Sequence, residues 1–429
     1  MLMERIAVFH PEGNIADNPH LSALVQVLYA HGYAVDIFSW HRPDIAYQPK
    51  DLPEHIRLFL LPRQYHFCEW AERYVLAIGV DDGLIYARNQ AEFLGIPYAH
   101  ISYELLFDDE LSAYPRLQSV KNKTRLAARN ICFAIIQDAV RAEHYAREYL
   151  VARDRIIIMP VAGADAVAYQ KSRHLHSLLN VPTNKKILLQ MGSLTSWSMT
   201  DWLLAHAHTM PENWVLVLHG RYGPGDYAAV DKPERVYYTA EPAKNFAELQ
   251  PVVQSADCCT ALYQPEKCSP SAGKNIQFVG LASGKFSTAL QYGVPVMVRH
   301  NSMMGDLIQE YGAGITINVD ENLSRLNMLD RLDNIHAACY KLFTERLSIN
   351  NHTNSFLDRI AQNKKTPDLK KHLACNTEYA KETLLYCIDN VDKYRAITLY
   401  FFMLKTIFCD AMTRIKRLIN CILNRKNKP

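Results

Sequence analysis

The chain has 429 residues, of which 49% are hydrophobic and 21% charged, with a formal net charge of +3. This length and composition bury substantial cores and exceed the usual size of one domain, which predicts two globular domains. The charge is mild and the body of the chain has no run of Lys and Arg, which argues against a nucleic-acid partner.

The cysteines and the first residues of the chain indicate the cellular compartment in which we expect the protein. Ten cysteines are scattered singly, apart from the neighbours Cys258 and Cys259, and no CxxC pair occurs. The pattern favours neither a zinc site nor a disulfide framework, so we expect reduced thiols in a cytoplasmic protein. The opening MLMERIAVFHPEG has charges at Glu4 and Arg5 and only a short apolar run, so we expect no secretory signal.

The first part of the chain alternates short apolar runs with segments of helical period. The expected strands lie in IAVFH, AVDIFSW, LFLLP, YVLAIGV, GIPYAHISY and CFAIIQD. Runs that are apolar throughout are typical of strands covered on both faces, which indicates an open parallel sheet between two helical layers. We assign residues 1–165 to this N-terminal Rossmann-like domain.

A second series of strands predicts a second doubly wound α/β domain over residues 185–330. The series is KKILLQMGSL, WVLVLHG, RVYYTA, CCTALY and VPVMVRH. The polar, proline-containing stretch 166–184 is interpreted as the hinge region, and 331–394 as a helical segment that completes the fold. Ligands of open α/β sheets bind beyond the carboxyl ends of the strands, so two facing sheets predict a cleft that presents two substrates.

The tripeptide Ser283-Gly284-Lys285 precedes a helical segment that Gly293 closes and a strand follows. Backbone amides and the positive end of a helix attract an anion, Gly284 allows close approach, and Lys285 adds a charge. The pattern therefore suits a phosphate. The alternative is an ordinary capped helix with a solvated lysine.

The stretch 275–317 resembles the donor-binding region of GT-B glycosyltransferases, particularly the group-1 or family-four type. In that family a loop–helix–strand unit ending in Gly-x-Pro binds the nucleotide diphosphate and ribose, and Gly293 and Pro295 match its end. The resemblance implies two Rossmann-like domains facing a cleft, with the donor on residues 185–330. The paired glutamates of the family are absent: Thr288 stands where a ribose-binding glutamate is common, and its hydroxyl is the candidate replacement.

Further donor contacts follow from the same resemblance. In the family, the turn after the first strand of this domain lies against the pyrophosphate, and in ILLQMGSL the strand runs into Gly192-Ser193. Arg221, beyond VLVLHG, is a candidate second cation, with a surface arginine as the alternative. Glu241, Pro242 and Tyr263 could border the base or ribose, with core or loop roles as the alternative.

The N-terminal domain resembles the acceptor side of these enzymes through IGVDDG and GIPYAHISYEL. Tyr103-Glu104 occupies the place of a His-Asp or Tyr-Glu pair, so Glu104 is the candidate catalytic carboxylate and Tyr103 an acceptor-side residue. His10 is a second catalytic candidate, and Gly13 lies in the same loop, where a glycine permits close approach. The alternatives are a helix-capping carboxylate for Glu104 and a structural role for His10.

The resemblance implies a glycosyltransferase that moves a hexose-like unit from a nucleotide sugar to a polysaccharide or lipid-linked oligosaccharide. We expect neither a metal nor a cofactor, because the resembled fold holds the diphosphate with amides, serine and basic side chains. Two alternatives stay open: a nucleotide-sugar epimerase of the same fold, and a catalytically idle binding scaffold. A dehydrogenase is disfavoured, since no GxGxxG follows a strand.

Residues 395–429 form an apolar segment that becomes basic toward its end. An apolar stripe of helical period from Ile407 to Ile422 lies opposite several Arg and Lys residues. The pattern predicts an interfacial helix that places the enzyme at the inner face of the cell membrane. The alternative is a terminal helix packed on the body of the protein or in a dimer.

Overall fold

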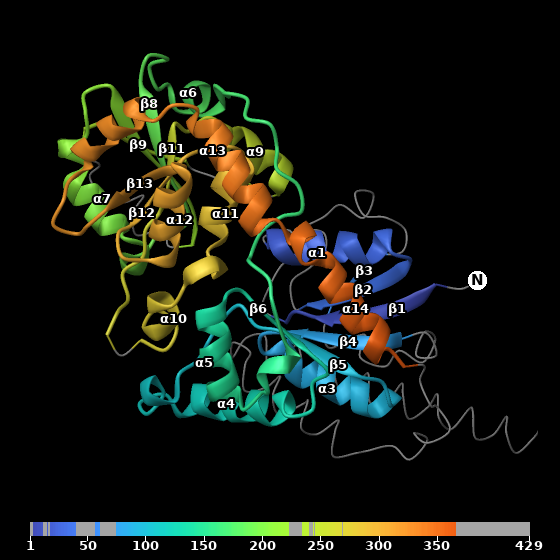
Figure 1. The fold of residues 1–429 in the computed structure, drawn as a ribbon. Coiled ribbons are helices and arrows are strands. Elements are labelled where there is room, and N and C mark those ends of the chain that lie inside the picture. Colours follow the sequence, from blue (N-terminus) through green and yellow to red (C-terminus); the bar gives the residue numbers. More distant parts are fainter. Residues whose placement is uncertain are drawn as a thin grey trace, which may run out of the picture.

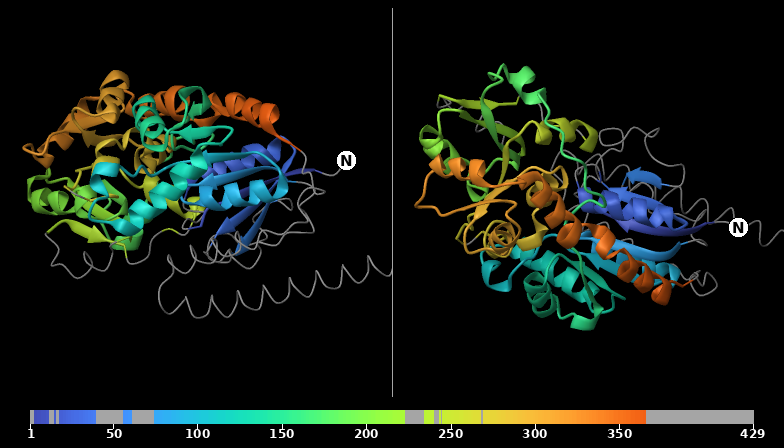
Figure 2. Two further views of the ribbon diagram at one scale, coloured as in Figure 1. Left: turned by 90° about the horizontal axis from the view of Figure 1, so that it is seen from below. Right: turned by 45° about the horizontal axis from the view of Figure 1, so that its top comes forward.

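The computed structural model describes residues 3–11, 15, 18–39, 56–60, 74–222, 234–239, 243, 245–267 and 269–365. Within these ranges the chain forms two Rossmann-like domains, each a parallel sheet between helices (Figures 1 and 2). The predicted α/β class with two doubly wound domains is confirmed.

The first sheet has seven strands in the order β3-β2-β1-β4-β5-β6-β7, all parallel to their neighbours. The strands are β1 Glu4–Phe9, β2 Tyr33–Ser39, β3 Ile56–Leu60, β4 Tyr74–Val80, β5 Tyr98–Ile101, β6 Ala134–Ile136 and β7 Ile156–Ile158. Alternate residues of β1 serve opposite faces, as a pleated strand requires: Ile6 and Val8 enter one core, Ala7 and Phe9 the other. This two-sided burial explains the continuous apolar runs.

Helices cover both faces of the first sheet. Helix α1 (Pro19–Ala30) packs on one face, and α3 (Gly83–Leu94), α4 (Pro115–Ala128) and α5 (Ala139–Tyr149) cover the other. The N-caps of α1 and α5 are Asn18 and Asp138, whose side chains accept backbone N–H groups of the first turn.

The second sheet has six parallel strands in the order β10-β9-β8-β11-β12-β13. The strands are β8 Lys186–Ser193, β9 Trp214–Tyr222, β10 Val236–Tyr238, β11 Cys258–Ala261, β12 Val296–Arg299 and β13 Gly314–Ile317. The helices of this half are α6 His174–Leu179, α7 Thr200–His206, α9 Phe246–Gln254, α10 Lys274–Gln277, α11 Gly284–Gln291, α12 Met303–Tyr311 and α13 Ile335–Leu342. One core lies under α9, α11, α12 and α13, and the other under α7.

The chain crosses between the two sheets twice. It first leaves β7 for the second domain, where the predicted hinge region 166–184 packs on the second core through Val167 and Tyr169. It returns after α13, and α14 (Thr353–Asn363) lies on the first sheet beside α1 (Figure 1). There Phe356 is fully buried and meets Phe133 of the first domain edge to face, with ring centroids 6.0 Å apart.

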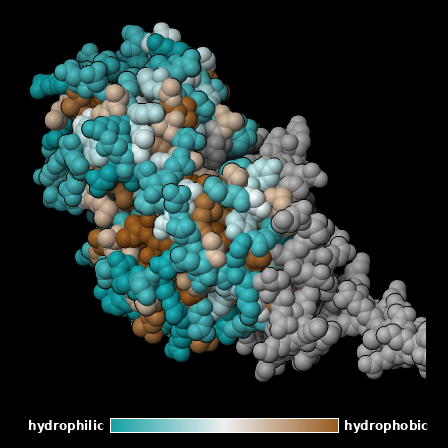
Figure 3. Space-filling view, turned by 45° about the vertical axis from the view of Figure 1, so that its right-hand side comes forward, coloured by the Kyte–Doolittle hydropathy of each residue, from teal (hydrophilic) through white to brown (hydrophobic). Residues whose placement is uncertain are grey.

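Hydrophilic residues dominate the two ends of the face seen in Figure 3, and hydrophobic residues gather near its middle, where the two domains adjoin. Among the described residues, no helix has the length and apolar character needed to cross a bilayer. The predicted basic tail, 395–429, lies outside the described residues, and its membrane role stays a prediction.

Candidate functional site

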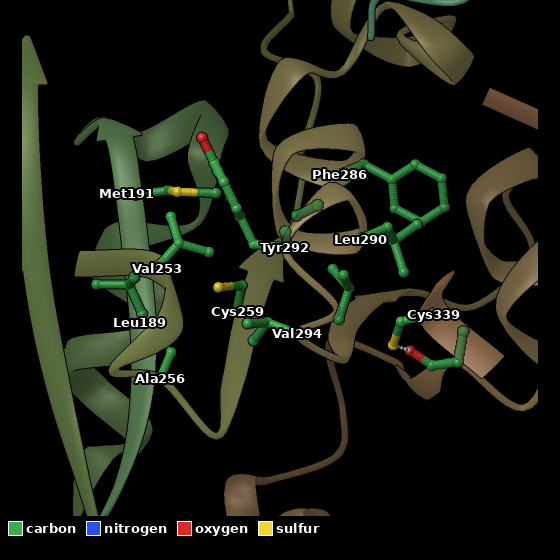
Figure 4. Close-up of a cluster of buried hydrophobic side chains, with 14 of the residues drawn as sticks. Leu189, Met191, Val253, Ala256, Cys259, Phe286, Leu290, Tyr292, Val294 and Cys339 are labelled. Atoms are coloured by element: carbon green, nitrogen blue, oxygen red, sulfur yellow. Dashed lines mark hydrogen bonds between the residues drawn. The ribbon is translucent and has the colours of Figure 1, made fainter. Parts of the chain in front are cut away.

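Helix α11 begins at the tripeptide singled out in the sequence. Ser283 is its N-cap, and the Ser283 hydroxyl oxygen accepts the backbone N–H of Phe286 at 3.2 Å. A Cβ added to Gly284 would have only Val161 within 4 Å, so the described chain leaves space beside this first turn. Phe286 and Leu290 anchor the helix in the second core on one side (Figure 4). The start of the helix is thus fixed by its cap and its packing, and the first backbone N–H groups of a helix have no carbonyl partner within the helix.

The two predicted donor segments meet at Lys285. Its Nζ donates to the backbone carbonyl of Ser193 at 3.0 Å, across 92 positions of sequence. Gly192 has φ +81°, and a Cβ there would come within 3.3 Å of Lys285 Cε, so glycine suits both the turn and the lysine. Loss of hydration lowers the pKa of the Lys285 ammonium to about 7.

Two aromatic rings border the Lys285 ammonium. Trp197 and Tyr263 lie nearly parallel, with centroids 6.2 Å apart, and Nζ is 5.8 Å from each centroid. Such contacts favour a cation. The Tyr263 and Ser283 hydroxyls are 2.7 Å apart, which ties the ring to the start of α11. Tyr263, only a weak candidate in the sequence, therefore lines the same site.

The acceptor-side pair, Tyr103 and Glu104, follows β5. Asp81, which directly follows β4, binds the backbone of both residues. Asp81 Oδ1 accepts the backbone N–H groups of Tyr103 at 2.7 Å and Glu104 at 3.0 Å. Burial raises the pKa of Asp81 to about 8, and the charge of Glu104 adds to the rise. The Glu104 side chain is exposed, yet surrounding protein removes much of its hydration, which raises its pKa, while Arg141 and Asn275 act in the opposite direction.

Tyr103 points back into the first domain. Its hydroxyl lies 2.8 Å from Nδ1 of His20, a fully buried residue of α1, and the two rings meet edge to face. Burial lowers the pKa of His20 to about 3, so its ring is neutral at physiological pH. The backbone of Tyr103 lies in the candidate site, and its hydroxyl binds a core residue.

The two halves of the site join through α10 and α5. Arg141, 1% exposed, donates to the backbone carbonyl of Phe278 at 3.0 Å and to that of Tyr103. Asn275 donates from Nδ2 to the Glu104 carboxylate. Burial raises the pKa of Tyr263 to about 12, and the charge of Glu104 adds to the rise, so Glu104 lies within electrostatic range of the donor segments.

The other predicted residues lie at varied places. Thr288 is on α11 but only 5% exposed, so little of it is presented to a ligand. The backbone of Arg221 lies near the end of β9, and nothing is described of its side chain. His10 follows β1, where its backbone N–H donates to Phe38 at 2.9 Å. Gly13, Glu241 and Pro242 lie outside the described residues. The ligand-binding roles of all these residues stay predictions.

Several residues of this site had no assigned role in the sequence. Asp81 had an available signal, because a carboxylate directly after a buried strand lies at the carboxyl edge of a sheet. Arg141 and Asn275 carried no local signal, since their contacts depend on the docking of the two domains. Trp197 meets Tyr263 and Lys285 within the second domain, and no motif in the sequence marked it. Nowhere in the described ranges do three or more His, Cys, Asp or Glu side chains gather as metal ligands would.

The architecture resembles that of solved glycosyltransferases. Sucrose-phosphate synthase from Thermosynechococcus elongatus superposes with a TM-score of 0.60 at 13% identity, over 84% of this chain and 98% of that one. Anabaena HepE, solved in complex with UDP-glucose, gives 0.61 at 14% identity, over 83% and 99%. This chain has the GT-B fold.

The GT-B fold is shared with proteins of another activity. A protein assigned as a UDP-N-acetylglucosamine 2-epimerase from Listeria monocytogenes gives a TM-score of 0.51 at 15% identity, over 84% of this chain and 97% of that one. No protein-family model and no curated protein matches the sequence. The GT-B fold itself is established, and the reaction and the acceptor belong to the proposal below.

Proposed function

We propose that the protein is a glycosyltransferase that moves a hexose-like unit from a nucleotide-sugar donor to a polysaccharide or lipid-linked oligosaccharide acceptor. The observation that carries the proposal is the contact of Lys285 with Ser193, which places a lysine between the β8 turn and the amino end of α11. A lysine, a helix amino terminus and a glycine turn together suit the two phosphates of such a donor.

The chemistry follows from where charge develops. As the bond between the sugar and the diphosphate breaks, negative charge grows on the leaving diphosphate. Lys285 and the positive amino end of α11 stabilise that charge, and they do so more strongly in the transition state than in the ground state. The acceptor oxygen forms the new bond to the anomeric carbon, and its proton passes to an ionised Glu104. No step of this scheme calls for a metal ion.

The donor is first identified by binding. A panel of UDP-, GDP-, ADP- and dTDP-sugars is screened for thermal stabilisation, beginning with UDP-sugars because HepE was solved with UDP-glucose. A donor at 100 times its dissociation constant stabilises the folded state by about 2.7 kcal/mol. The stabilising donor is then offered with lipid-linked and polysaccharide acceptors, and transfer is followed by mass spectrometry.

Lys285→Ala tests the assignment within this assay. We expect the variant to fold normally and to lose most transfer activity, because the proposed role of the ammonium is to bind the diphosphate, whereas Phe286 and Leu290 anchor α11 in the core. Lys341→Ala, at an exposed lysine of α13, is the matched control and should keep full activity. Normal turnover by Lys285→Ala, or stabilisation by no nucleotide sugar, would refute the proposal.

A second candidate, a nucleotide-sugar epimerase, is favoured by one observation. Asp81 and Glu104 are adjacent carboxylates with raised pKa values, and an epimerase requires acid and base groups around one bound sugar. Incubation of the donor in deuterium oxide without an acceptor separates the two. Deuterium in the sugar ring together with an epimeric product would favour the epimerase.

A further inference from the structure

Asn275 is a buried amide of the second domain that reaches into the first. It lies in α10, is 5% exposed, and is 171 positions from Glu104 in the sequence. Its Nδ2 group donates to the Glu104 carboxylate and, at 3.2 Å, to the backbone carbonyl of Ser271. Its Oδ1 accepts the backbone N–H of Leu105 at 3.0 Å and faces the Arg141 guanidinium at 3.4 Å.

This set of partners fixes the orientation of the amide. The oxygen meets two donors and the nitrogen meets two acceptors, so a flipped amide would create four mismatched contacts. Both the oxygen and the nitrogen of the Asn275 amide are therefore hydrogen-bonded. One of these bonds goes to the Glu104 carboxylate, and another goes to the backbone of Leu105, the next residue.

Three other interdomain contacts near Asn275 are made by carboxylates other than Glu104. Lys274 forms an ion pair with Asp109, and the backbone N–H of Lys274 donates to Glu110 at 2.9 Å. Asp138 accepts the backbone N–H of Leu281 at 3.1 Å. These contacts dock the two domains, whereas Asn275 also holds a side chain of the candidate site.

We propose that Asn275 is a positioning residue for Glu104, so that the acceptor-side carboxylate is held in place only while the donor-binding domain is docked on the first domain. The inference rests on the proposed function and deepens it, because it makes proton removal from the acceptor depend on the domain that binds the donor. Two elements then hold Glu104: Asp81 fixes its backbone, and Asn275 fixes its carboxylate.

The pH dependence of the reaction reports this role. The groups that face Glu104 are Asp81 after β4, Arg141 on α5, Tyr263 after β11 and Asn275 on α10. The hydrogen bond from Asn275 favours the ionised carboxylate, so its loss raises the pKa of Glu104. A base with a raised pKa is ionised over a narrower range, and activity then fails at a higher pH as the solution is acidified.

The test compares Asn275→Ala and Asn275→Asp with Lys274→Ala. Asn275→Asp keeps the acceptor oxygen for Leu105 and Arg141, which guards against a simple folding failure. In both Asn275 variants we expect the acidic limb of the kcat/KM profile to move up by about one pH unit. We also expect kcat to fall by about tenfold or more, with the donor KM little changed. Lys274→Ala, which weakens docking only, should leave the limb in place.

A double variant separates positioning from docking. In a Glu104→Gln background, adding Asn275→Ala should cause little further loss, because Asn275 acts through the Glu104 carboxylate, which the first change has already removed. Equal, independent losses would overturn the inference, as would an acidic limb that moves no more in Asn275→Ala than in Lys274→Ala.

A direct titration of the Glu104 carboxyl tests the positioning role without relying on transfer activity. Glutamate labelled with 13C at the side-chain carboxyl is incorporated, and the Glu104 signal is assigned by its absence in Glu104→Gln. If the wild-type chain transfers no sugar, the proposed function fails, and a raised Glu104 midpoint in Asn275→Ala still supports the positioning role. An unchanged midpoint overturns it, whatever the activity.

Discussion

Lys285 donates its side-chain nitrogen to the backbone carbonyl of Ser193 at 3.0 Å, while the rings of Trp197 and Tyr263 lie 5.8 Å from the same nitrogen. None of these three neighbours is a carboxylate. Burial lowers the pKa of Lys285 to about 7, and among the described residues no negative group offsets it. A diphosphate would supply the missing charge.

Donor binding at pH 8 should therefore take up a proton. Free Lys285 is mostly neutral at that pH, and the bound diphosphate raises its pKa so that it becomes charged. Calorimetric titration with the nucleotide sugar in two buffers of different ionisation enthalpy measures the uptake, which should approach one proton per site. Lys285→Met should show none. A binding heat that is the same in both buffers for the wild-type chain would contradict the prediction.

Glu104→Gln should lower turnover by about a hundredfold or more and change donor affinity little, since a general base contributes about 10² to 10⁴ in rate. Glutamine keeps the size of the side chain and accepts from Asn275 but cannot accept the proton. Turnover and donor binding are measured separately, by initial rates and by calorimetry. A loss of donor affinity as large as the loss of rate would move Glu104 to the donor side.

Acid should weaken the fold through buried histidines. The pKa of His100 is lowered to about 3 by burial, with Nδ1 2.7 Å from the Tyr145 hydroxyl and Nε2 near the Asp81 carbonyl. Below about pH 6.5 the unfolded chain binds a proton at this position and the folded chain does not. Stability is therefore lost as the pH falls from about 6.5 toward 3.

Urea unfolding of the wild-type chain and of His100→Asn at pH 7 and pH 5 measures the contribution of His100 to the pH dependence of stability. The fall in unfolding free energy between the two pH values should be smaller in the variant by about 2 kcal/mol. The comparison uses the change with pH, so the packing loss at pH 7 cancels. An identical pH dependence in both proteins would exclude the histidine as a cause.

Phe356→Ala should destabilise the first domain, although residue 356 is remote from that domain in sequence. The side chain is fully buried in the core beneath α1, and truncation of such a residue costs about 3 to 5 kcal/mol. Tyr340→Ala, at a half-exposed aromatic residue of α13, should change stability by about 0.5 kcal/mol or less. Urea denaturation of both variants measures the loss of unfolding free energy, and equal losses in the two variants would contradict the prediction.

Removal of residues 395–429 should release the enzyme from anionic bilayers. The basic residues of this segment each contribute on the order of 1 kcal/mol near an anionic surface, so binding should weaken as salt rises. Liposome flotation of the full and truncated chains is the test. Absence of lipid binding by the full chain would refute the membrane role, and aggregation of the truncated chain would instead indicate packing on the protein.

The sequence predicted those parts of the molecule that depend on local patterns. The Ser283-Gly284-Lys285 turn and the Gly192-Ser193 turn each follow from a strand, a turn and a helix in order, and the structure brings them together. Strands β7 and β13 were not predicted as strands. β7 has three residues and β13 has four, and each lies at an edge of its sheet.

The contacts between the domains could not be predicted in this way. Asn275 meets Glu104, and Arg141 meets Phe278, only because two separately folded sheets dock in one orientation. The direction of the Tyr103 side chain could not be predicted either. Its place after β5 was predicted, but its hydroxyl binds His20 of α1, and the sequence does not specify which residues of α1 face Tyr103.

The two crossings of the chain run side by side and are bonded to each other. Ile349 donates its backbone N–H to Gly163 at 3.2 Å, and Asn350 donates to the carbonyl of Ala164 at 3.1 Å and to the Asp165 carboxylate at 2.9 Å. Two tethers joined at one place act as a single pivot. Sliding the domains apart would stretch both tethers at once, so this junction favours rotation of one domain against the other over translation.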